Sequence, residues 1–440
     1  MALSQISICD HTSEQKLEHR EIEQMTSAIS INQSCELPHR REAEKNAKDS
    51  GKRKIQLLFC FQGCFLRHTD GCHSRVLQIL NLLRLCDVDV TVYSYSNNRS
   101  WPWDEKYKSE FSSRYPEWRL VLEEDSWTRR TIGRGRTVLS ALFPSLGDKI
   151  LKTPVPLIMP RLDKLCRNDR FDYVMFNNAD GLTQINGIPK GKIIVDMHDF
   201  SALESFQTGK PANWRAMVKL RKEICLLNVT DIIWCISQSE YTVAKEVLPG
   251  KKISFIPANA DILNDLQVAT GEEEYKLLFL GSNNRWNADA LLKFLGSYET
   301  WEIRPKLAVA GRVCDDARIR DRASRNPDIS LLGYQEDLVQ LYRNAAATIC
   351  PVEGTGTKIK VVESLAAKRP VFAAEGAMRG LAPGYECCVF PLREDAVRGT
   401  LYNRDAVANA SRAAVAYSIA NGTGKLINTI LSDLHALVII

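Results

Sequence analysis

The chain has 440 residues, of which 45% are hydrophobic and 25% are charged, and its formal net charge at pH 7 is +5. This length is too great for one hydrophobic core and predicts two domains of ordinary size. The composition is that of a globular protein, and so slight a net charge argues against nucleic acid as a partner. Neither a membrane-spanning apolar stretch nor a signal peptide is evident, so we expect a cytoplasmic protein.

The cysteines argue against disulfides. Their number, 13, is odd, and they are scattered along the chain, which indicates buried, reduced thiols. Cys60, Cys64, His68, Cys72 and His73 are residue types that bind zinc, but a second tight Cys or His pair at regular spacing is missing. We therefore predict no bound metal and no cofactor.

The first half of the chain alternates between apolar runs and helical patterns. Residues 1–54 combine mixed charge with few aromatic residues, which predicts a disordered or loosely helical tail. The runs 55–60 and 88–95, with a helical pattern at 76–85 between them, predict a β-α-β unit. Further apolar runs lie at 171–176, 192–197, 232–236 and 253–256. We therefore predict a doubly wound α/β domain over residues 55–256.

Candidate ligand-facing residues in this domain follow two of the predicted strands. The loop after the first strand contains Gly63, Asp70, Gly71 and Arg75, and ligands bind at the carboxyl ends of parallel strands. His198 directly follows the run 192–197, so its imidazole is expected at the same edge of the sheet. General acid/base catalysis or hydrogen bonding to a substrate is its predicted role.

Residues 101–170 are harder to interpret. A basic segment at 126–136 is followed by an apolar one at 137–160. Such an insertion can lie on an anionic membrane surface. The alternative is an ordinary solvated face that packs on the sheet, and the frequency of charge runs in globular proteins favours it.

The second half of the chain begins with a polar stretch, 257–274, that predicts an interdomain linker. A second α/β domain is expected over 275–440, with a helix at 337–346 and three helices near the carboxyl terminus. Its apolar runs lie at 277–280, 307–310, 329–332, 347–350 and 371–374. Gly281, Arg285, Gly311 and Arg312 follow the first two of these runs, where phosphate-binding loops occur.

Residues 351–371, PVEGTGTKIKVVESLAAKRPV, carry the strongest ligand signal. Gly354 and Gly356 can adopt positive φ and allow a ligand to approach the backbone. Thr355 and Thr357 are expected to cap a helix over 358–367, whose free N–H groups and positive dipole end attract phosphate.

Three charged side chains complete this predicted anion site. Lys358 and Lys360 add positive charge beside the helix start. Glu363 lies about one and a half turns into the helix, where it can accept hydrogen bonds from ribose hydroxyls. A diphosphate next to a ribose indicates a nucleotide ligand.

Four stretches of the sequence, in this order, resemble a known family: the retaining nucleotide-sugar glycosyltransferases of the GT-B fold in the large group called family 4, or glycosyl transferases group 1. The last stretch is similar to that family's signature, GxGxKxKxxEALAxGxPVV. The stretches are DMHDF at 196–200, CISQSEYTVAKEVLPGKKISFIPANAD at 235–261, LLFLGSNNRWNADALLKFL at 277–295 and PVEGTGTKIKVVESLAAKRPVFAAEGAMRGL at 351–381.

The resemblance implies two Rossmann-like domains that face a cleft, with the nucleotide-sugar donor held mainly by the second domain and the acceptor by the first. It implies that Glu363 binds the donor ribose, that residues 354–357 surround the diphosphate, and that His198 approaches the sugar. Gly71 would lie near the departing phosphate, with Arg285 and Lys358 as positive charges that stabilise the leaving group. Retention of configuration and independence from metal are further implications.

The sequence departs from the family's pattern in several places, one of which concerns a pair of glutamates. Many members carry two glutamates separated by seven residues, and the earlier position is Thr355 here, while Glu353 lies two residues upstream. Either Glu353 takes that role or no residue does. We count His198, Glu353 and Lys358 as the candidate catalytic residues.

The predicted activity is transfer of a sugar from a nucleotide diphosphate donor to a hydroxyl of a glycan or glycosylated acceptor, in surface glycan or polysaccharide synthesis. For this activity we expect a cytoplasmic protein that contacts the inner face of the membrane peripherally. The alternatives are a catalytically silent partner or scaffold protein of the same fold, and a nucleotide-sugar epimerase of the same fold.

Overall fold

The computed structural model describes residues 53–67, 71–125, 158–168, 170–200, 214–260, 266–354 and 356–435. Of the predicted tail, only residues 53 and 54 are among them. The basic segment 126–136 and most of the apolar segment after it also lie outside the described residues. Residues Ile55–Ile440 form one compact unit, which contains two parallel β-sheets.

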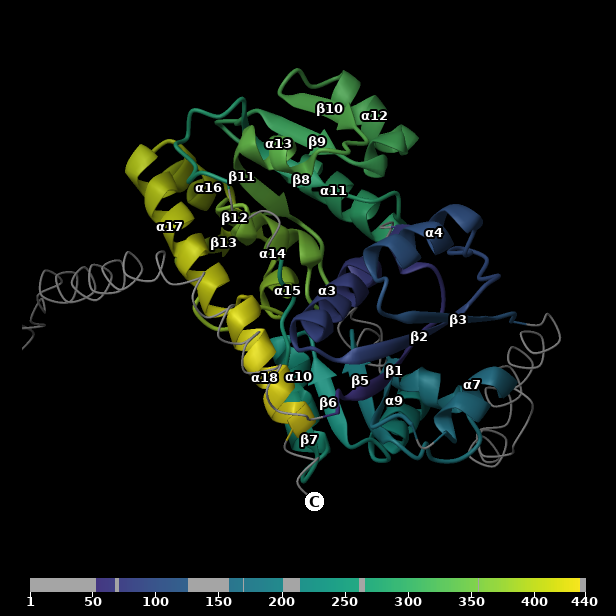
Figure 1. The fold of residues 1–440 in the computed structure, drawn as a ribbon. Helices are drawn as coiled ribbons and strands as arrows, with labels where there is room; N and C mark the ends of the chain where they lie inside the picture. Colours follow the sequence, from purple (N-terminus) through teal and green to yellow (C-terminus); the bar gives the residue numbers. More distant parts are fainter. Residues whose placement is uncertain are drawn as a thin grey trace, which may run out of the picture. The chain divides into compact units, whose positions relative to one another are not determined.

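The first sheet has seven parallel strands in the order β3-β2-β1-β4-β5-β6-β7 (Figure 1). The strands are β1 (Gln56–Phe61), β2 (Asp89–Tyr95), β3 (Arg119–Glu123), β4 (Tyr173–Asn177), β5 (Lys192–Met197), β6 (Ile232–Cys235) and β7 (Lys252–Phe255). The connecting α-helices are α3 (Gly71–Leu85), α4 (Glu105–Arg114), α7 (Pro160–Cys166), α9 (Trp214–Leu227) and α10 (Gln238–Val247). Short 3-10 helices cover Phe65–Arg67 and Ala179–Gln184.

The second sheet has six parallel strands in the order β10-β9-β8-β11-β12-β13. They are β8 (Tyr275–Leu280), β9 (Leu307–Ala310), β10 (Ile329–Gly333), β11 (Ala345–Cys350), β12 (Val371–Ala373) and β13 (Val389–Pro391). The helices are α11 (Arg285–Tyr298), α12 (Ala317–Ser324), α13 (Leu338–Arg343), α14 (Ile359–Ala366), α15 (Glu375–Met378), α16 (Glu394–Leu401), α17 (Arg404–Ala420) and α18 (Thr423–His435), with a 3-10 helix at Arg312–Asp315.

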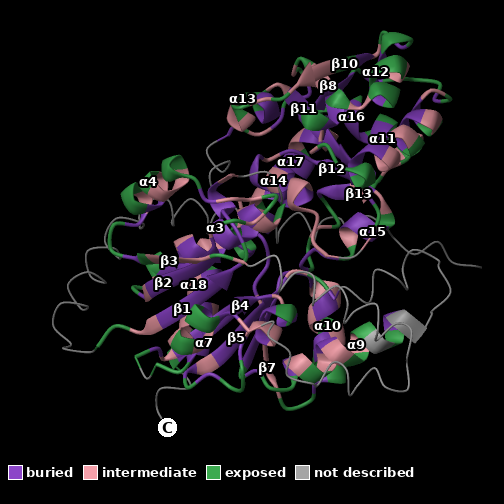
Figure 2. Cartoon of the chain, turned by 90° about the vertical axis from the view of Figure 1, so that its right-hand side faces the viewer, coloured by how far each residue is buried: buried purple, intermediate pink, exposed green. Residues whose placement is uncertain are grey.

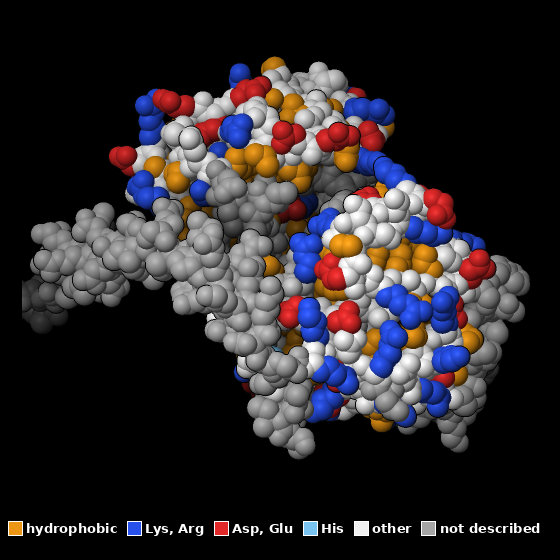
Figure 3. Space-filling view, viewed as in Figure 1, with side chains coloured by type: hydrophobic (Ala, Val, Ile, Leu, Met, Phe, Trp, Pro, Cys, Tyr) orange, Lys and Arg blue, Asp and Glu red, His pale blue; other side chains and the backbone are white. Residues whose placement is uncertain are grey.

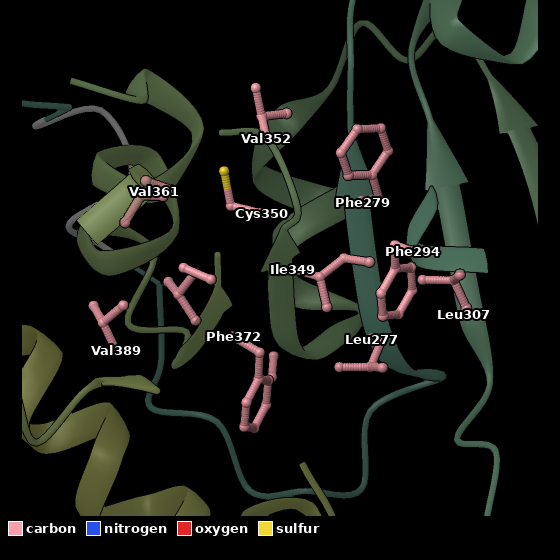
Figure 4. Close-up of a cluster of buried hydrophobic side chains, with 14 of the residues drawn as sticks. Leu277, Phe279, Phe294, Leu307, Ile349, Cys350, Val352, Val361, Phe372 and Val389 are labelled. Atoms are coloured by element: carbon pink, nitrogen blue, oxygen red, sulfur yellow. The ribbon is translucent and has the colours of Figure 1, made fainter. Parts of the chain in front are cut away.

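Both sheets are buried on two faces, which is why their strands appear in the sequence as continuous apolar runs. In Figure 2 the central strands are purple, while the outward faces of helices such as α4 and α12 are green. Figure 4 shows the core of the second sheet, where Ile349 and Leu307 extend from the strands toward Phe294 of α11. Interlocking side chains of this kind hold each sheet to its covering helices.

The predicted strands and the doubly wound α/β class are confirmed, with three local differences. The first helix begins at Gly71 and not at residue 76, so part of the predicted loop is helical. The helix predicted over 337–346 ends at Arg343, because Ala345 and Ala346 lie in the buried strand β11, where small side chains fit. The strands β3 and β13 were not predicted; both are short edge strands, with few fully buried residues.

The last helix differs from its predicted assignment to the second domain. Leu426, Ile430 and Leu434 of α18 are buried in the same core as strands β1 and β2 of the first sheet. Asp433 of α18 accepts a hydrogen bond from Trp234 Nε1 at 2.8 Å and pairs with Lys252 Nζ at 3.0 Å. The carboxyl-terminal helix therefore belongs to the core of the first sheet, and Figure 1 shows it beside β6 and β7.

Each sheet has one point at which the strand order reverses direction along the chain. In the first sheet this point lies between β1 and β4, and in the second it lies between β8 and β11. Ligands of open parallel sheets bind outside the carboxyl ends of the strands at such points. The loops that follow these four strands are therefore the places where a functional site is expected.

The face shown in Figure 3 carries Lys and Arg side chains interspersed with Asp and Glu. Among the described residues, exposed charges of opposite sign form pairs, as those of Arg318 with Asp289 and Asp316 and of Arg325 with Asp321. Exposed pairs contribute little to stability, and mixing both signs keeps the surface potential low. This mixing agrees with the small net charge of the sequence.

Candidate functional site

The loop after β11 has the backbone that the sequence predicts. Gly354 has φ 116° and Gly356 has φ 71°, conformations that residues with a Cβ rarely adopt. Thr355, between them, lies outside the described residues. Two glycines with positive φ turn the chain sharply at the carboxyl end of a central strand, and this turn places the start of α14 at the reversal point of the sheet.

The start of α14 differs from the prediction. Its N-cap is Lys358, whose side chain makes no capping hydrogen bond. Thr357 does not cap it, because its hydroxyl donates to the Ile236 carbonyl at 2.9 Å and lies 3.2 Å from the Gly380 carbonyl. Ile236 follows β6 of the first sheet, so Thr357 ties the two sheets together instead.

Two lysines lie at this helix start. Lys358 Nζ donates to the Gly356 carbonyl at 3.4 Å, and Lys360 Nζ donates to Asn287 Oδ1 at 2.7 Å. Burial lowers the pKa of both ammonium groups from the ordinary value. The Lys360 contact joins α14 to the first turn of α11, which brings two helix starts and two cations together.

Glu363 is the carboxylate predicted for the ribose. It lies on the second turn of α14, partly buried, and its Oε2 accepts a hydrogen bond from the Tyr342 hydroxyl at 3.4 Å. Burial raises the pKa of Glu363 to about 7, while Tyr342 and Lys360 act in the opposite direction. A carboxyl group with this pKa changes its charge near neutral pH.

Glu353 makes a structural contact. Its Oε2 accepts the backbone N–H of Gly376 at 2.8 Å, at the start of the short helix α15. A Cβ added at Gly376 would lie 2.2 Å from this oxygen, so the glycine allows the carboxylate to approach. Glu353 therefore has one oxygen engaged by the backbone.

His198 follows β5, and its side chain is 14% exposed. Its Nε2 lies 3.3 Å from both Asp196 Oδ2 and Asn177 Oδ1. Its backbone N–H donates to Asn178 Oδ1 at 3.1 Å, and Asn178 itself has a positive φ of 71°, which Asn tolerates better than most residues. Residues from the ends of β4 and β5 thus fix both the ring and the backbone of His198.

The His198 segment and the glycine loop lie against each other. A Cβ added at Gly356 would lie 3.3 Å from the His198 carbonyl oxygen and 3.8 Å from Asp199 Cβ. A Cβ added at Gly71, the first residue of α3, would lie 3.3 Å from Ile359 Cγ1 at the start of α14. The structure therefore brings together His198, Gly71, Gly356 and Lys358.

Several other predicted residues do not join this group of contacts. Gly281 and Gly311 pack backbone against backbone, since a Cβ on Gly311 would lie 2.3 Å from the Gly281 carbonyl oxygen. Arg285 is 89% exposed and pairs with Asp289 within the same helix at 3.0 Å. Arg312 lies over the exposed ring of Tyr334 at 5.5 Å.

The loop after β1 also differs from its prediction. Gly63 packs against Trp101, whose Cβ and carbonyl oxygen would each lie 3.0 Å from an added Cβ. Arg75 is not in a loop but in α3, where it is buried and pairs with Asp196 at 2.7 Å. Gly71 is exposed, and Asp70 lies outside the described residues.

Sequence reasoning missed four polar residues around the site: Asn177, Asp196, Glu240 and Asn287. Asp196 interrupts an otherwise apolar central strand, IIVDM, and a charge there is a signal that could have been used. Glu240 is 2% exposed, and its Oε1 accepts the backbone N–H of Phe200 at 3.1 Å. Burial raises the pKa of Glu240 to about 8.

Two features are absent from the described residues. No cluster of three or more His, Cys, Asp or Glu side chains in this part of the chain could hold a metal ion. Likewise, no helix in the described ranges combines the length and apolar character that crossing a membrane requires.

Comparison with known families identifies the second half of the chain. Residues 274–402 match the family described as glycosyl transferases group 1. This segment runs from the end of the predicted linker to just beyond α16, and it contains Gly354, Lys358 and Glu363. No curated protein sequence matches the chain significantly.

Solved structures identify the fold of the whole described unit. Sucrose-phosphate synthase from Thermosynechococcus elongatus matches with a TM-score of 0.59 at 13% identity, covering 88% of this chain and 99% of the other. A mutant of S. aureus TarM in complex with Fondaparinux, alpha-GlcNAc-glycerol and UDP matches with a TM-score of 0.61 at 10% identity, covering 87% and 100%. WaaG, a glycosyltransferase involved in lipopolysaccharide biosynthesis, matches with a TM-score of 0.55 at 15% identity, covering 86% and 99%.

These similarities show that the chain has the GT-B fold of glycosyltransferases, with a group 1 glycosyltransferase domain over residues 274–402.

Proposed function

We propose that the protein transfers a sugar from a nucleoside diphosphate donor to a hydroxyl group of a glycan or glycosylated acceptor, with retention of configuration. The observation that carries the proposal is the contact between the glycine loop at 354–356 and the His198 segment. The loop continues into the start of α14, where Lys358 and Lys360 lie, so a helix start with two lysines adjoins the segment that carries His198. An anionic leaving group and a reacting sugar need these two kinds of environment at adjacent positions.

The donor is proposed to bind at the start of α14. Lys358 and Lys360 are the buried cations nearest to this helix start, and burial strengthens their interaction with an anion. The diphosphate would lie on the backbone at 356–360, and the ribose hydroxyls would donate to Glu363. Negative charge grows on the diphosphate as the glycosidic bond breaks, so these cations stabilise the transition state more than the bound donor.

The acceptor is proposed to approach from the first sheet, beside His198. The imidazole can hydrogen-bond to the transferred sugar or move a proton at the acceptor hydroxyl. TarM was solved with UDP and an alpha-GlcNAc-glycerol, and WaaG acts in lipopolysaccharide biosynthesis, which supports a glycan acceptor and a role in surface glycan synthesis. Cytoplasmic location, with contact at the inner face of the membrane, is part of the same proposal.

The experiment begins with a thermal-shift screen of UDP-, GDP- and ADP-sugars, followed by calorimetry on each nucleotide that binds. Glu363→Ala removes the proposed ribose acceptor and is expected to weaken binding by about 10-fold or more, the value of one hydrogen bond to a charged group. Glu246→Ala, at an exposed position on α10, is the matched control and is expected to bind normally. Unchanged affinity in a folded Glu363→Ala variant would contradict the ribose assignment.

One observation favours a second function, that of a catalytically silent partner protein. Thr355 occupies the position of the family's earlier glutamate, and the nearby Glu353 is engaged by the backbone N–H of Gly376. A silent protein would bind a nucleoside diphosphate without consuming its sugar. Nucleotide binding together with undetectable hydrolysis and transfer, across the bound donors and a panel of glycan acceptors, would favour this second function.

A further inference from the structure

A buried ion pair lies directly behind His198. Asp196 is 0% exposed and Arg75 is 1% exposed, and they form two hydrogen bonds, Arg75 Nη2 to Asp196 Oδ1 at 2.7 Å and Arg75 Nε to Asp196 Oδ2 at 3.1 Å. The same Oδ2 lies 3.3 Å from His198 Nε2. A buried pair of this kind is costly unless each charge is fully compensated, so its position behind the imidazole calls for a functional explanation.

The ionisation of Asp196 determines what it can do. Burial alone would raise its pKa, but the Arg75 guanidinium and the hydrogen bond from His198 together hold the pKa at about 2. Near neutral pH the carboxylate is therefore charged and can only accept hydrogen bonds. Its neighbour Nε2 of His198 must be the donor in this contact.

A second acceptor lies at the same ring nitrogen. Asn177 Nδ2 donates to the Cys60 carbonyl at 3.1 Å, and this bond fixes the orientation of the amide. Asn177 Oδ1 then lies 3.3 Å from His198 Nε2. Two acceptor oxygens at one nitrogen require that nitrogen to carry a proton, because a lone pair there would face two other lone pairs.

We propose that Asp196, neutralised by Arg75 and assisted by Asn177, is a positioning residue that keeps the His198 proton on Nε2 and leaves Nδ1 as the ring nitrogen for the substrate. Neutral His198 then offers a lone pair at Nδ1, and protonated His198 offers a donor there. Arg75 compensates the carboxylate charge within the protein. The importance of this arrangement for sugar transfer rests on the proposed function.

A purely structural role is the rival explanation for the same contacts. Arg75 Nη1 also lies 3.4 Å from the Pro257 carbonyl, to which Gln78 Nε2 donates at 2.8 Å. The pair thus joins α3 and β5 to the chain that leaves the first sheet. Removing the Arg75–Asp196 pair would lower the stability of the protein whether its role is structural or functional. A test therefore needs a measurement that does not depend on stability.

The first measurement is the tautomer of His198. The full-length protein, labelled with ¹⁵N-histidine, is examined by long-range ¹H–¹⁵N correlation NMR above pH 7, and the His198 signals are identified by their loss in His198→Gln. A neutral ring with its proton on Nε2 is expected, and a ring with its proton on Nδ1 would overturn the proposal. This result does not depend on enzyme activity, so it stands even if the proposed function fails.

The second measurement uses the double variant Arg75→Gln/Asp196→Asn, which removes both buried charges and avoids leaving one of them uncompensated. An amide at 196 can present either oxygen or NH₂ to the ring, so the Nδ1-protonated form is expected to appear in the NMR spectrum. Turnover is expected to fall about 10- to 100-fold, which is a fraction of the rate enhancement that a positioned acid or base supplies. The KM for the donor should not change, and the dependence of turnover on pH should shift. A folded double variant with wild-type turnover and pH profile would show a structural role only.

Discussion

The two sheets share one strand order, yet the sites at their reversal points are built differently. In the first sheet the polar groups near the reversal point contact one another. Arg75 pairs with Asp196. Asn177 contacts both the Cys60 carbonyl and the His198 ring. Charges there are neutralised within the protein. These contacts within the protein hold the polar groups of this half in place, which is what positioning an imidazole requires.

In the second sheet two partly buried lysines lie at the reversal point. Lys360 donates to the amide oxygen of Asn287, and Lys358 donates to a backbone carbonyl. Because burial lowers the pKa of both groups, their charged forms are disfavoured in this structure. The proposed diphosphate would add negative charge beside these two lysines, so we propose that this half holds the ligand and that the first half positions His198.

The largest effect is expected where the first half meets the substrate. His198→Ala should reduce sugar transfer by about 10²- to 10⁴-fold, because it removes a positioned acid, base or hydrogen-bonding group. Nucleotide affinity, measured by calorimetry, should stay near the wild-type value, since the donor is proposed to bind at the other sheet. The rate of sugar transfer is measured in a single-turnover assay. A rate for His198→Ala equal to that of the wild type would show that His198 does not take part in the reaction.

The next effect tests the electrostatics of the second half. Lys360→Met keeps the length of the side chain and removes its charge, and it should weaken binding of the nucleoside diphosphate by about 10- to 100-fold. Binding of the corresponding nucleoside, which lacks the phosphates, should not change. Lys293→Met, at an exposed position on α11, is the control; if it weakened binding as much as Lys360→Met, a local site would be contradicted.

A smaller effect concerns pH and Glu240. Its folded pKa is about 8, above the ordinary value of 4.5, so between these values the folded protein keeps a proton that the unfolded chain has lost. Its contribution to stability is therefore present at low pH and is lost as the pH rises toward 8, by at most about 1.4 kcal/mol per pH unit. Glu363 acts in the same direction up to about pH 7.

Glu240→Gln keeps an acceptor for the Phe200 N–H and cannot ionise. Urea unfolding at pH 5, 6.5 and 8 should therefore show a flatter dependence of the unfolding free energy on pH for the variant than for the wild type. Parallel curves for the two proteins would show that burial does not hold the proton on Glu240.

The smallest effect tests the contact between the two halves. Gly356→Ala and Gly333→Ala both place a Cβ at positive φ, 71° and 67°, and each should cost about 1 kcal/mol of stability. Nothing lies within 4 Å of a Cβ at Gly333, whereas one at Gly356 would lie 3.3 Å from the His198 carbonyl. Only Gly356→Ala should also lower transfer, and equal activity of the two variants would argue against this contact.

The fold was predictable because central parallel strands are buried on both faces and therefore appear as continuous apolar runs. The run 192–197 coincides with β5, and 307–310 coincides with β9. The edge strand β3 has few fully buried residues and gives no such pattern. The packing of α18 against the first sheet could not be predicted, since an amphipathic helix shows which face it buries but not which sheet it covers.

The candidate site was predictable to a different degree in each half. Positive φ at Gly354 and Gly356 follows from residue type and local order, and the structure confirms it. The roles of Arg75 and Thr357 were not predictable, because their partners Asp196 and Ile236 lie 121 residues away in each case. Lys360 was predicted beside a phosphate, but only the structure shows that Asn287 holds it.

The sequence by itself determined the alternation of strands and helices, the glycine turn after β11 and the charged residues at the start of α14. These features depend on local pattern and on backbone conformations that few residue types allow. Tertiary structure alone decided which charged groups lie together and how deeply each is buried. Ion pairing and burial depend on distances between residues far apart in the chain, and in this protein they distinguish the half that positions His198 from the half that is suited to an anion.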